Sequence, residues 1–342
     1  MCSPLSFHFF YVTLKAEEIL YLSKKKSEME NRSLVTIADH SKEKIMYLLR
    51  MAGEFEKHTN RKLLEGKVVA TLFFEPSTRT RLSFETAANR LGARVIGLRP
   101  ESDQFHQGRN PEGHHHDGKQ LCRFDCHAAL SRRGGPLCFR GVAGAHYQCG
   151  RRGNQHPSQT MLDLYSIYKT QGTLDNLQIY MVGDLKYGRT VHSLLMAMRH
   201  FNPTFHFIAP EELKMPDVYK QYCDIHHIKY VEHTDFTADT IAGADILYMT
   251  RVQKERFTDL MEYERVKDLY LLKLSMLKKA KDNMRILHPL PRVNEIEYAI
   301  DDDPHAYYFE QAHNGLFARQ ALICDALGLT LDDVMNDRTI ID

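Results

Sequence analysis

A dense group of hydroxyl and guanidinium side chains follows an apolar run near residue 75. The group reads Ser77-Thr78-Arg79-Thr80-Arg81 and comes directly after the β-prone run Lys67–Phe74. A helix that begins here would direct free backbone N–H groups and the positive end of its dipole at an anion. Arg79 adds a planar charged group that suits phosphate. The motif therefore predicts a phosphate site, and a capped helix with surface arginines is the alternative interpretation.

Four later segments combine residue types that bind carbonyl oxygens, amides or carboxylates. They are Gly153-Asn-Gln-His156-Pro-Ser-Gln159, Val182-Gly-Asp-Leu-Lys-Tyr-Gly-Arg189, Met249-Thr-Arg251-Val-Gln253 and His288-Pro-Leu290-Pro291-Arg292. His156 alone also suits a hydrogen-bonded structural histidine, and Arg189 also suits a helix surface. Arg251 follows an expected strand end, where α/β sheets bind their ligands. Three neighbouring residues are interpreted as local structure or packing: Lys186, Tyr187 and His192.

The spacing of apolar residues predicts the elements that must position these side chains. A helix is expected after a Ser41 N-cap, followed by a strand at 67–74, a helix to about Leu91 and a strand at Arg94–Leu98. Further strands are expected at Gln178–Val182, Thr204–Ala209, Ile228–Val231, Asp245–Thr250 and Arg285–Leu287, and further helices around Thr160–Thr170 and Leu316–Leu327. The pattern predicts an α/β protein of two domains, each an open, mainly parallel sheet flanked by helices, with a cleft between them.

Composition narrows the class of protein. A length of 342 residues suits two domains, and 43% hydrophobic with 26% charged residues is ordinary for a globular chain. A formal net charge of +1 gives no basic field for nucleic acid, and no run approaches the roughly 18–20 apolar residues of a membrane span. Seven cysteines form no disulfide scaffold, and Ser3–Leu14 lacks the features of a signal peptide. We expect a cytoplasmic protein without nucleic-acid or membrane partners, whose residues 1–28 extend beyond a start at Met29.

The five ordered motifs together resemble the transcarbamylase family. Ser77–Arg81 with Ser83-Phe-Glu85 resembles its carbamoyl-phosphate motif, and His156-Pro-Ser-Gln159 resembles its His-Pro-x-Gln motif. The remaining three segments look like those of aspartate carbamoyltransferases, since the ornithine enzymes typically have cysteine after the histidine of His288-Pro. The resemblance runs from about Ser33 to Leu329, with one interruption.

The resemblance implies a one-carbon transferase that moves the carbamoyl group of carbamoyl phosphate to the amine of L-aspartate, without cofactor or metal. The implied catalytic residues are Arg79, Thr80 and His156. The implied carbamoyl-phosphate ligands are Ser77, Thr78, Arg79, Thr80, His156, Gln159, Leu290 and Pro291. The implied aspartate ligands are Arg189, Arg251 and Gln253.

The resemblance also implies domains and partners. A carbamoyl-phosphate domain is expected at 29–157, completed by a C-terminal helix at 314–335, and an aspartate domain at 158–313. The family resemblance implies a homotrimer with active sites at subunit interfaces, to which regulatory chains could bind.

The interruption lies between Pro100 and Gly153. This segment holds nine of the 19 glycines and four of the seven cysteines, and it lacks a lysine and an arginine that the family pattern places there. Read one nucleotide later with suitable synonymous codons, residues 109–132 regain helix and strand periodicity. The lysine and arginine then reappear in the codons of Gln107 and Ala128. Compensating frameshifts near residues 100 and 153 are therefore one hypothesis.

Other interpretations stay open at this point. Cys122, Cys126, Cys138, Cys149, His127 and His114–His116 could form a zinc module, although their spacing is irregular. The chain as written could be an impaired enzyme or a pseudoenzyme with a poorly folded first domain, because the segment has few aliphatic residues. Another amine acceptor is the nearest enzymatic alternative.

Overall fold

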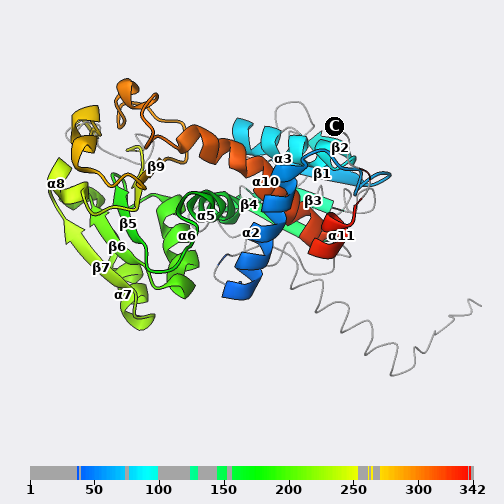
Figure 1. Cartoon of the computed structure of the whole chain (residues 1–342), viewed down its shortest axis with the longest axis horizontal. Coiled ribbons are helices and arrows are strands. Elements are labelled where there is room, and N and C mark those ends of the chain that lie inside the picture. The colour runs from blue at the N-terminus through cyan, green and yellow to red at the C-terminus, as the bar shows by residue number, and fades with distance from the viewer. Residues whose placement is uncertain are drawn as a thin grey trace, which may run out of the picture.

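The structure, a computed structural model, describes residues 37, 40–73, 77–98, 124–129, 145–151, 156–252, 261, 263–264, 270–337 and 339. Two parallel sheets form two lobes, which lie side by side in Figure 1. Within the described ranges, none of the helices combines the length and the apolar character that a bilayer span requires. The predicted α/β class is confirmed.

The first lobe is built on a sheet of four parallel strands in the order β2-β1-β3-β4. Its strands are β1 (Val68–Phe73), β2 (Arg94–Leu98), β3 (Phe124–Ala129) and β4 (Ala145–Arg151). Helices α2 (Lys42–Lys57) and α3 (Thr78–Arg90) pack in this lobe. Ser41 caps α2 as predicted, because its side chain accepts a hydrogen bond from the Lys44 backbone N–H at 3.3 Å.

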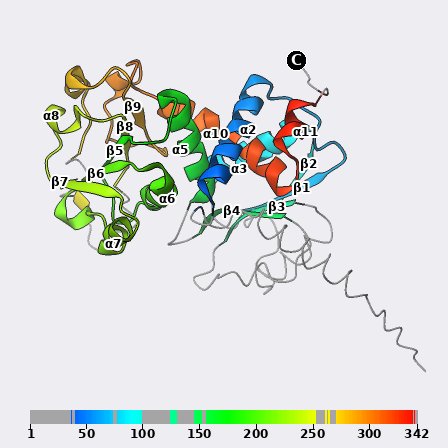
Figure 2. The same cartoon turned by 60° about the horizontal axis from the view of Figure 1, so that its bottom comes forward.

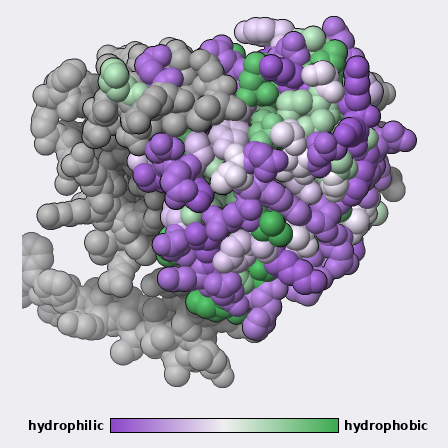
Figure 3. Space-filling view, turned by 90° about the vertical axis from the view of Figure 1, so that its left-hand side faces the viewer, coloured by the Kyte–Doolittle hydropathy of each residue, from purple (hydrophilic) through white to green (hydrophobic). Residues whose placement is uncertain are grey.

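The second lobe is built on five parallel strands in the order β7-β6-β5-β8-β9. The strands are β5 (Gln178–Val182), β6 (Thr204–Ile208), β7 (Lys229–His233), β8 (Ile246–Met249) and β9 (Arg285–Leu287). The helices are α6 (Arg189–Met198), α7 (Asp217–Ile225) and α8 (Ala238–Ile241), with 3₁₀ turns at Arg199–Phe201, Glu211–Leu213, Leu274–Lys279 and Tyr298–Ile300. β8 is fully buried, which its continuous apolar sequence explains. The outer face of this lobe is mainly hydrophilic (Figure 3).

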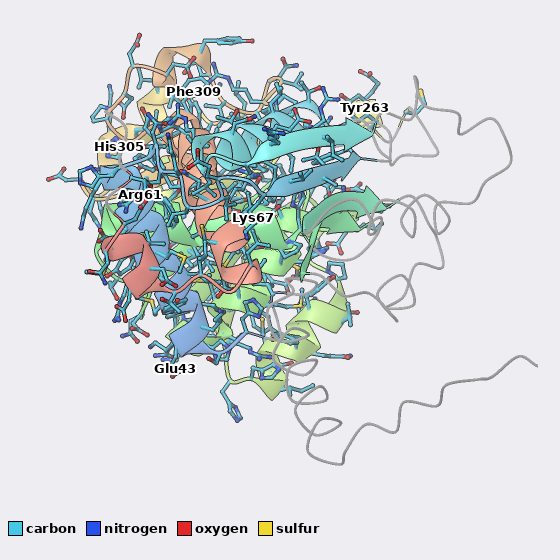
Figure 4. All side chains as sticks on the ribbon, turned by 90° about the vertical axis from the view of Figure 1, so that its right-hand side faces the viewer. Glu43, Arg61, Lys67, Tyr263, His305 and Phe309 are labelled. Carbon is cyan, nitrogen blue, oxygen red and sulfur yellow. The ribbon has the colours of Figure 1, made fainter. Side chains whose placement is uncertain are left out.

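Two long helices join the lobes. Helix α5 (Pro157–Gln171) lies between the sheets, and α10 (Tyr308–Ala326) runs from the second lobe across to the first (Figures 1 and 2). Helix α10 packs against α2, α3 and α5, so the C-terminal part of the chain returns to the first lobe. The short helix α11 (Leu331–Met335) follows, and the buried Arg61 donates to the Val334 carbonyl oxygen there (Figure 4).

Helix α10 begins eight residues before the predicted Leu316. Its first turns carry Gln311 and Asn314, which break the apolar periodicity of the sequence although both side chains are buried. Gln311 bonds to Asp163, and Asn314 bonds to Ser166. The predicted start was wrong because polar residues that find partners on another helix occupy a buried face.

The segment at 100–153 contributes two strands that the sequence analysis did not predict. Strand β3 pairs in parallel with β1, and β4 pairs with β3, so both extend the first sheet (Figure 2). Parallel backbone pairing does not need an apolar side-chain pattern to supply its hydrogen bonds. The structure describes these strands by their backbone, and the rest of the segment lies outside the described residues.

Candidate active site

A cavity of about 670 Å³ opens between the two lobes. It lies where β1, β4, β8 and β9 end, which is the position expected for ligands of open α/β sheets. The predicted residues that line it are Ser77, Thr78, Arg79, Thr80, His156, Gln159, Arg189, Arg251, Leu290 and Pro291. Gln253 lies outside the described residues. Segments more than 200 residues apart in sequence therefore meet at one cavity.

The start of α3 provides the anion-binding side of the cavity. Ser77 is the N-cap residue, its side chain makes no capping bond, and the first helical turn contains no acidic residue. Within this turn, therefore, no carboxylate neutralises the backbone N–H groups. Partial desolvation, and then the charge of Arg251, lower the pKa of the Arg79 guanidinium. Two cationic groups from different lobes thus face one space, which favours a polyanionic ligand.

His156 immediately precedes α5 and brings a neutral imidazole to the cavity. Burial, followed by the charges of Arg189 and Arg319, lowers the pKa of His156 to about 3. Its buried Nδ1 atom has no hydrogen-bond partner in the described part of the chain. A neutral imidazole can donate one hydrogen bond to a carbonyl oxygen without adding charge. The structure therefore places this implied catalytic residue where a neutral imidazole can polarise a carbonyl oxygen.

Gln159 lies in the first turn of α5 and points its amide at a buried carboxylate. Its Nε2 atom donates to Asp163 Oδ1 at 2.9 Å. Asp163 itself is fully buried within α5. The sequence analysis missed Asp163, although a charged residue within the apolar run Met161–Tyr165 was a signal for a buried polar role.

Arg189 and Arg251 reach the cavity from two elements of the second lobe. Arg189 is the first residue of α6, directly after Gly188, where a Cβ atom would lie 2.5 Å from the Asp184 carbonyl oxygen. Arg251 follows β8, where Thr250 accepts a hydrogen bond from the Asp184 backbone N–H at 2.9 Å. The same residue, Asp184, therefore fixes the chain beside both arginines.

The loop after β9 is shaped by a buried histidine and glutamate. His288 Nδ1 accepts from the Leu290 backbone N–H at 2.8 Å, and His288 Nε2 lies 2.7 Å from Glu295 Oε1. Glu295 Oε2 also accepts from the backbone N–H groups of Val293 and Asn294, each at 3.0 Å. Burial acts to raise the pKa of Glu295, but these hydrogen bonds bring it below its ordinary value. The loop is held with Leu290 and Pro291 at the cavity.

Two of the residues interpreted as local structure or packing, Tyr187 and His192, make contacts within the second lobe. His192 is buried, its Nε2 lies 2.7 Å from the Leu185 carbonyl oxygen, and its ring stacks on Tyr219 at 3.9 Å. The Tyr187 backbone N–H donates to Asp184 Oδ1 at 2.8 Å.

No cluster of three or more potential metal ligands occurs among the residues whose side chains the structure describes. The cysteines and histidines of the suggested zinc module lie outside them.

Comparisons with known proteins extend over most of the chain. Residues 32–169 match the model of the aspartate/ornithine carbamoyltransferase carbamoyl-P binding domain, and 175–325 match that of the Asp/Orn binding domain. An aspartate carbamoyltransferase catalytic subunit of Phocaeicola vulgatus is 67% identical over 314 residues, covering 90% of this chain and 99% of the relative. One from Bacteroides fragilis is 66% identical over 312 residues, covering 90% of this chain and 100% of the relative.

Solved structures agree with these matches. The catalytic subunit of M. jannaschii aspartate transcarbamoylase has a TM-score of 0.81 and 39% identity, covering 86% of this chain and 98% of that one. A Trypanosoma cruzi aspartate transcarbamoylase in complex with carbamoyl phosphate and aspartate has a TM-score of 0.80 and 28% identity, covering 86% and 96%. With both domain models matched in order and relatives of this identity matched over nearly their whole length, the chain belongs to the aspartate/ornithine carbamoyltransferase family.

Proposed function

We propose that this chain transfers the carbamoyl group of carbamoyl phosphate to the α-amine of L-aspartate, giving N-carbamoyl-L-aspartate and phosphate for pyrimidine synthesis. The amine nitrogen bonds to the carbonyl carbon, the bond from that carbon to the phosphate oxygen breaks, and the amine loses a proton. One observation carries this proposal. A single cavity brings Arg79 and the start of α3, whose first turn has no acidic residue, together with Arg189 and Arg251 of the other lobe. Relatives that are named catalytic subunits favour this active form over an impaired one.

Carbamoyl phosphate would lie against the first lobe. The start of α3 with Ser77, Thr78 and Arg79 would hold its phosphate, because N–H donors and a guanidinium match phosphate oxygens. Thr80 and the neutral His156 would donate to the carbonyl oxygen, where negative charge develops during attack. The backbone carbonyl oxygens of Leu290 and Pro291 would accept hydrogen bonds from the amino groups of the substrates. Catalysis would come from positioning and electrostatic stabilisation, since phosphate is already a good leaving group.

Aspartate would lie against the second lobe. Arg189 and Arg251 would each bind one carboxylate, and Gln253 would assist. Two guanidinium groups suit a dicarboxylate and would repel the side-chain ammonium of ornithine. The Trypanosoma cruzi relative, whose structure contains both carbamoyl phosphate and aspartate, supports this choice of acceptor.

The predicted domains and assembly belong to the same proposal. A carbamoyl-phosphate domain at 29–157 would be completed by residues 314–335, and the packing of α10 on α2 and α3 supports this division. The aspartate domain would span 158–313. We propose a cytoplasmic homotrimer with active sites at subunit interfaces, able to bind regulatory chains.

We also propose that the segment at 100–153 reflects two compensating frameshifts. Its support is that the chain covers 99–100% of the length of its relatives, as a pair of compensating shifts would preserve. The nucleotide sequence across codons 98–155 tests this. Insertions or deletions near both ends are expected, and an unbroken frame that encodes Gln107 and Ala128 would contradict it.

The amine acceptor decides the proposed function. Purified chain should convert labelled carbamoyl phosphate to carbamoyl-aspartate with aspartate and give no citrulline with ornithine. Transfer to ornithine in preference to aspartate would reject the proposal.

A further inference from the structure

A fully buried carboxylate lies directly behind the cavity. Asp163 accepts three hydrogen bonds: Gln159 Nε2 at 2.9 Å and Gln311 Nε2 at 2.6 Å on Oδ1, and the Tyr248 hydroxyl at 2.9 Å on Oδ2. The three donors come from α5, α10 and β8. A carboxylate this deep is unusual in a protein unless each of its oxygens is satisfied, as both are here.

The hydrogen bonds of this cluster all run in one direction. The His288 backbone N–H donates to Gln311 Oε1 at 2.8 Å, so the amide of Gln311 must present its NH₂ group to Asp163. An ionised carboxylate has no proton to donate, so Gln159 must also present its NH₂ group. The Oε1 atom of Gln159 is then directed away from Asp163, and Gln159 lines the cavity.

We propose that Asp163 is a positioning residue that fixes the side-chain amide of Gln159, so that Gln159 Oε1 accepts from the carbamoyl NH₂ group. This inference rests on the proposed function. A carbamoyl group carries a donor and an acceptor of nearly equal size, so the recognising amide must have a defined orientation. A reversed Gln159 would place one NH₂ group against another, and this arrangement loses a hydrogen bond and leaves donors unpaired.

The protonation state of Asp163 controls the same contact. Burial raises the pKa of Asp163 to about 7, although the bonds from Gln311, Tyr248 and Gln159 and the charge of Arg319 act to lower it. Tyr248 and Arg319 are the titratable and charged groups facing it from the described elements. A protonated Asp163 can donate, which removes the constraint on Gln159. Carbamoyl-phosphate binding should therefore weaken as the pH falls below about 7.

A double-mutant cycle tests the inference. Asp163→Leu keeps the number and branching of the side-chain heavy atoms but removes the acceptor, and Gln159→Ala removes the recognising amide. We expect each to raise the KM for carbamoyl phosphate about tenfold, and the double variant to be no worse than Gln159→Ala. Ser166→Ala is the matched control, because Ser166 lies on the same helix and binds Asn314 of α10 at 3.1 Å. It should leave this KM unchanged.

Asp163→Asn provides a second readout if the leucine variant does not fold. Its Oδ1 can accept from both glutamines, and its NH₂ group can donate to the Tyr248 oxygen while Tyr248 turns to Thr190. We expect activity within about threefold of wild type at pH 8, with the rise in KM below pH 7 abolished.

Three results would each overturn the inference. They are additive losses in the cycle, an unchanged KM in folded Asp163→Leu, and a rise in KM below pH 7 that persists in Asp163→Asn. Wild-type chain that makes no carbamoyl-aspartate would instead count against the proposed function.

Discussion

The backbone N–H of His156 donates a hydrogen bond of 2.9 Å to Ser193 Oγ. The same hydroxyl donates to the Arg189 carbonyl oxygen at 2.8 Å. Ser193 is fully buried, so one side chain fixes the distance between the proposed carbonyl-polarising residue and a proposed aspartate ligand. Small displacements of residues that position two reacting substrates can lower the reaction rate strongly.

Replacing Ser193 tests this connection. Ser193→Ala should lower kcat about tenfold, because His156 and Arg189 lose their common partner while both side chains remain. Steady-state kinetics with both substrates measures the change. Thr170→Val is the control, because Thr170 lies near the C-terminal end of α5, whereas His156 precedes its N-terminal end. It should leave kcat unchanged. A wild-type kcat in folded Ser193→Ala would show that the connection has no catalytic role.

His156 should stay neutral across the working pH range. Its pKa of about 3 lies below the ordinary value of 6.5, so the native state excludes a proton that the unfolded chain binds. This group therefore reduces the free energy of unfolding as the pH falls from about 6.5 towards 3. NMR of the imidazole in free enzyme should show no titration between pH 5 and 8. A midpoint near 6.5 would contradict the described burial.

The loop that carries Leu290 depends on the ionised form of Glu295. In Glu295→Gln, an NH₂ group replaces an oxygen that accepts from His288 or from two backbone N–H groups. The unpaired donors should loosen the loop and raise the KM for carbamoyl phosphate roughly 3- to 30-fold. Glu297→Gln is the control, because Glu297 is exposed and lies two residues further along the chain. It should leave the KM for carbamoyl phosphate unchanged. Equal KM values for the two variants would show that this loop does not affect carbamoyl-phosphate binding.

The sequence was sufficient to predict the elements whose burial follows from their own residues. Strands β2, β5 and β9 have the predicted bounds, and the motifs that follow β5 and β9 reach the same cavity. It was insufficient to predict contacts between segments that are distant in the chain. Asp163 and Gln311 are 148 residues apart, and neither periodicity nor charge pattern shows that they meet. The start of α10 and strands β3 and β4 were missed for the same reason, because tertiary partners determine them.

The kinetics of an Arg251 variant test most directly the claim that aspartate binds at this cavity. Arg251 follows the carboxyl end of β8, whereas Arg285 lies at the amino end of the neighbouring β9 and donates to the Asp282 carbonyl oxygen at 3.0 Å. The measurement is the rate of carbamoyl-aspartate formation by the wild type, Arg251→Lys and Arg285→Lys. Loss of a two-pronged carboxylate contact should lower kcat/KM for aspartate about 100-fold in Arg251→Lys, with Arg285→Lys near wild type. Equal rates in all three proteins would contradict aspartate binding at this cavity.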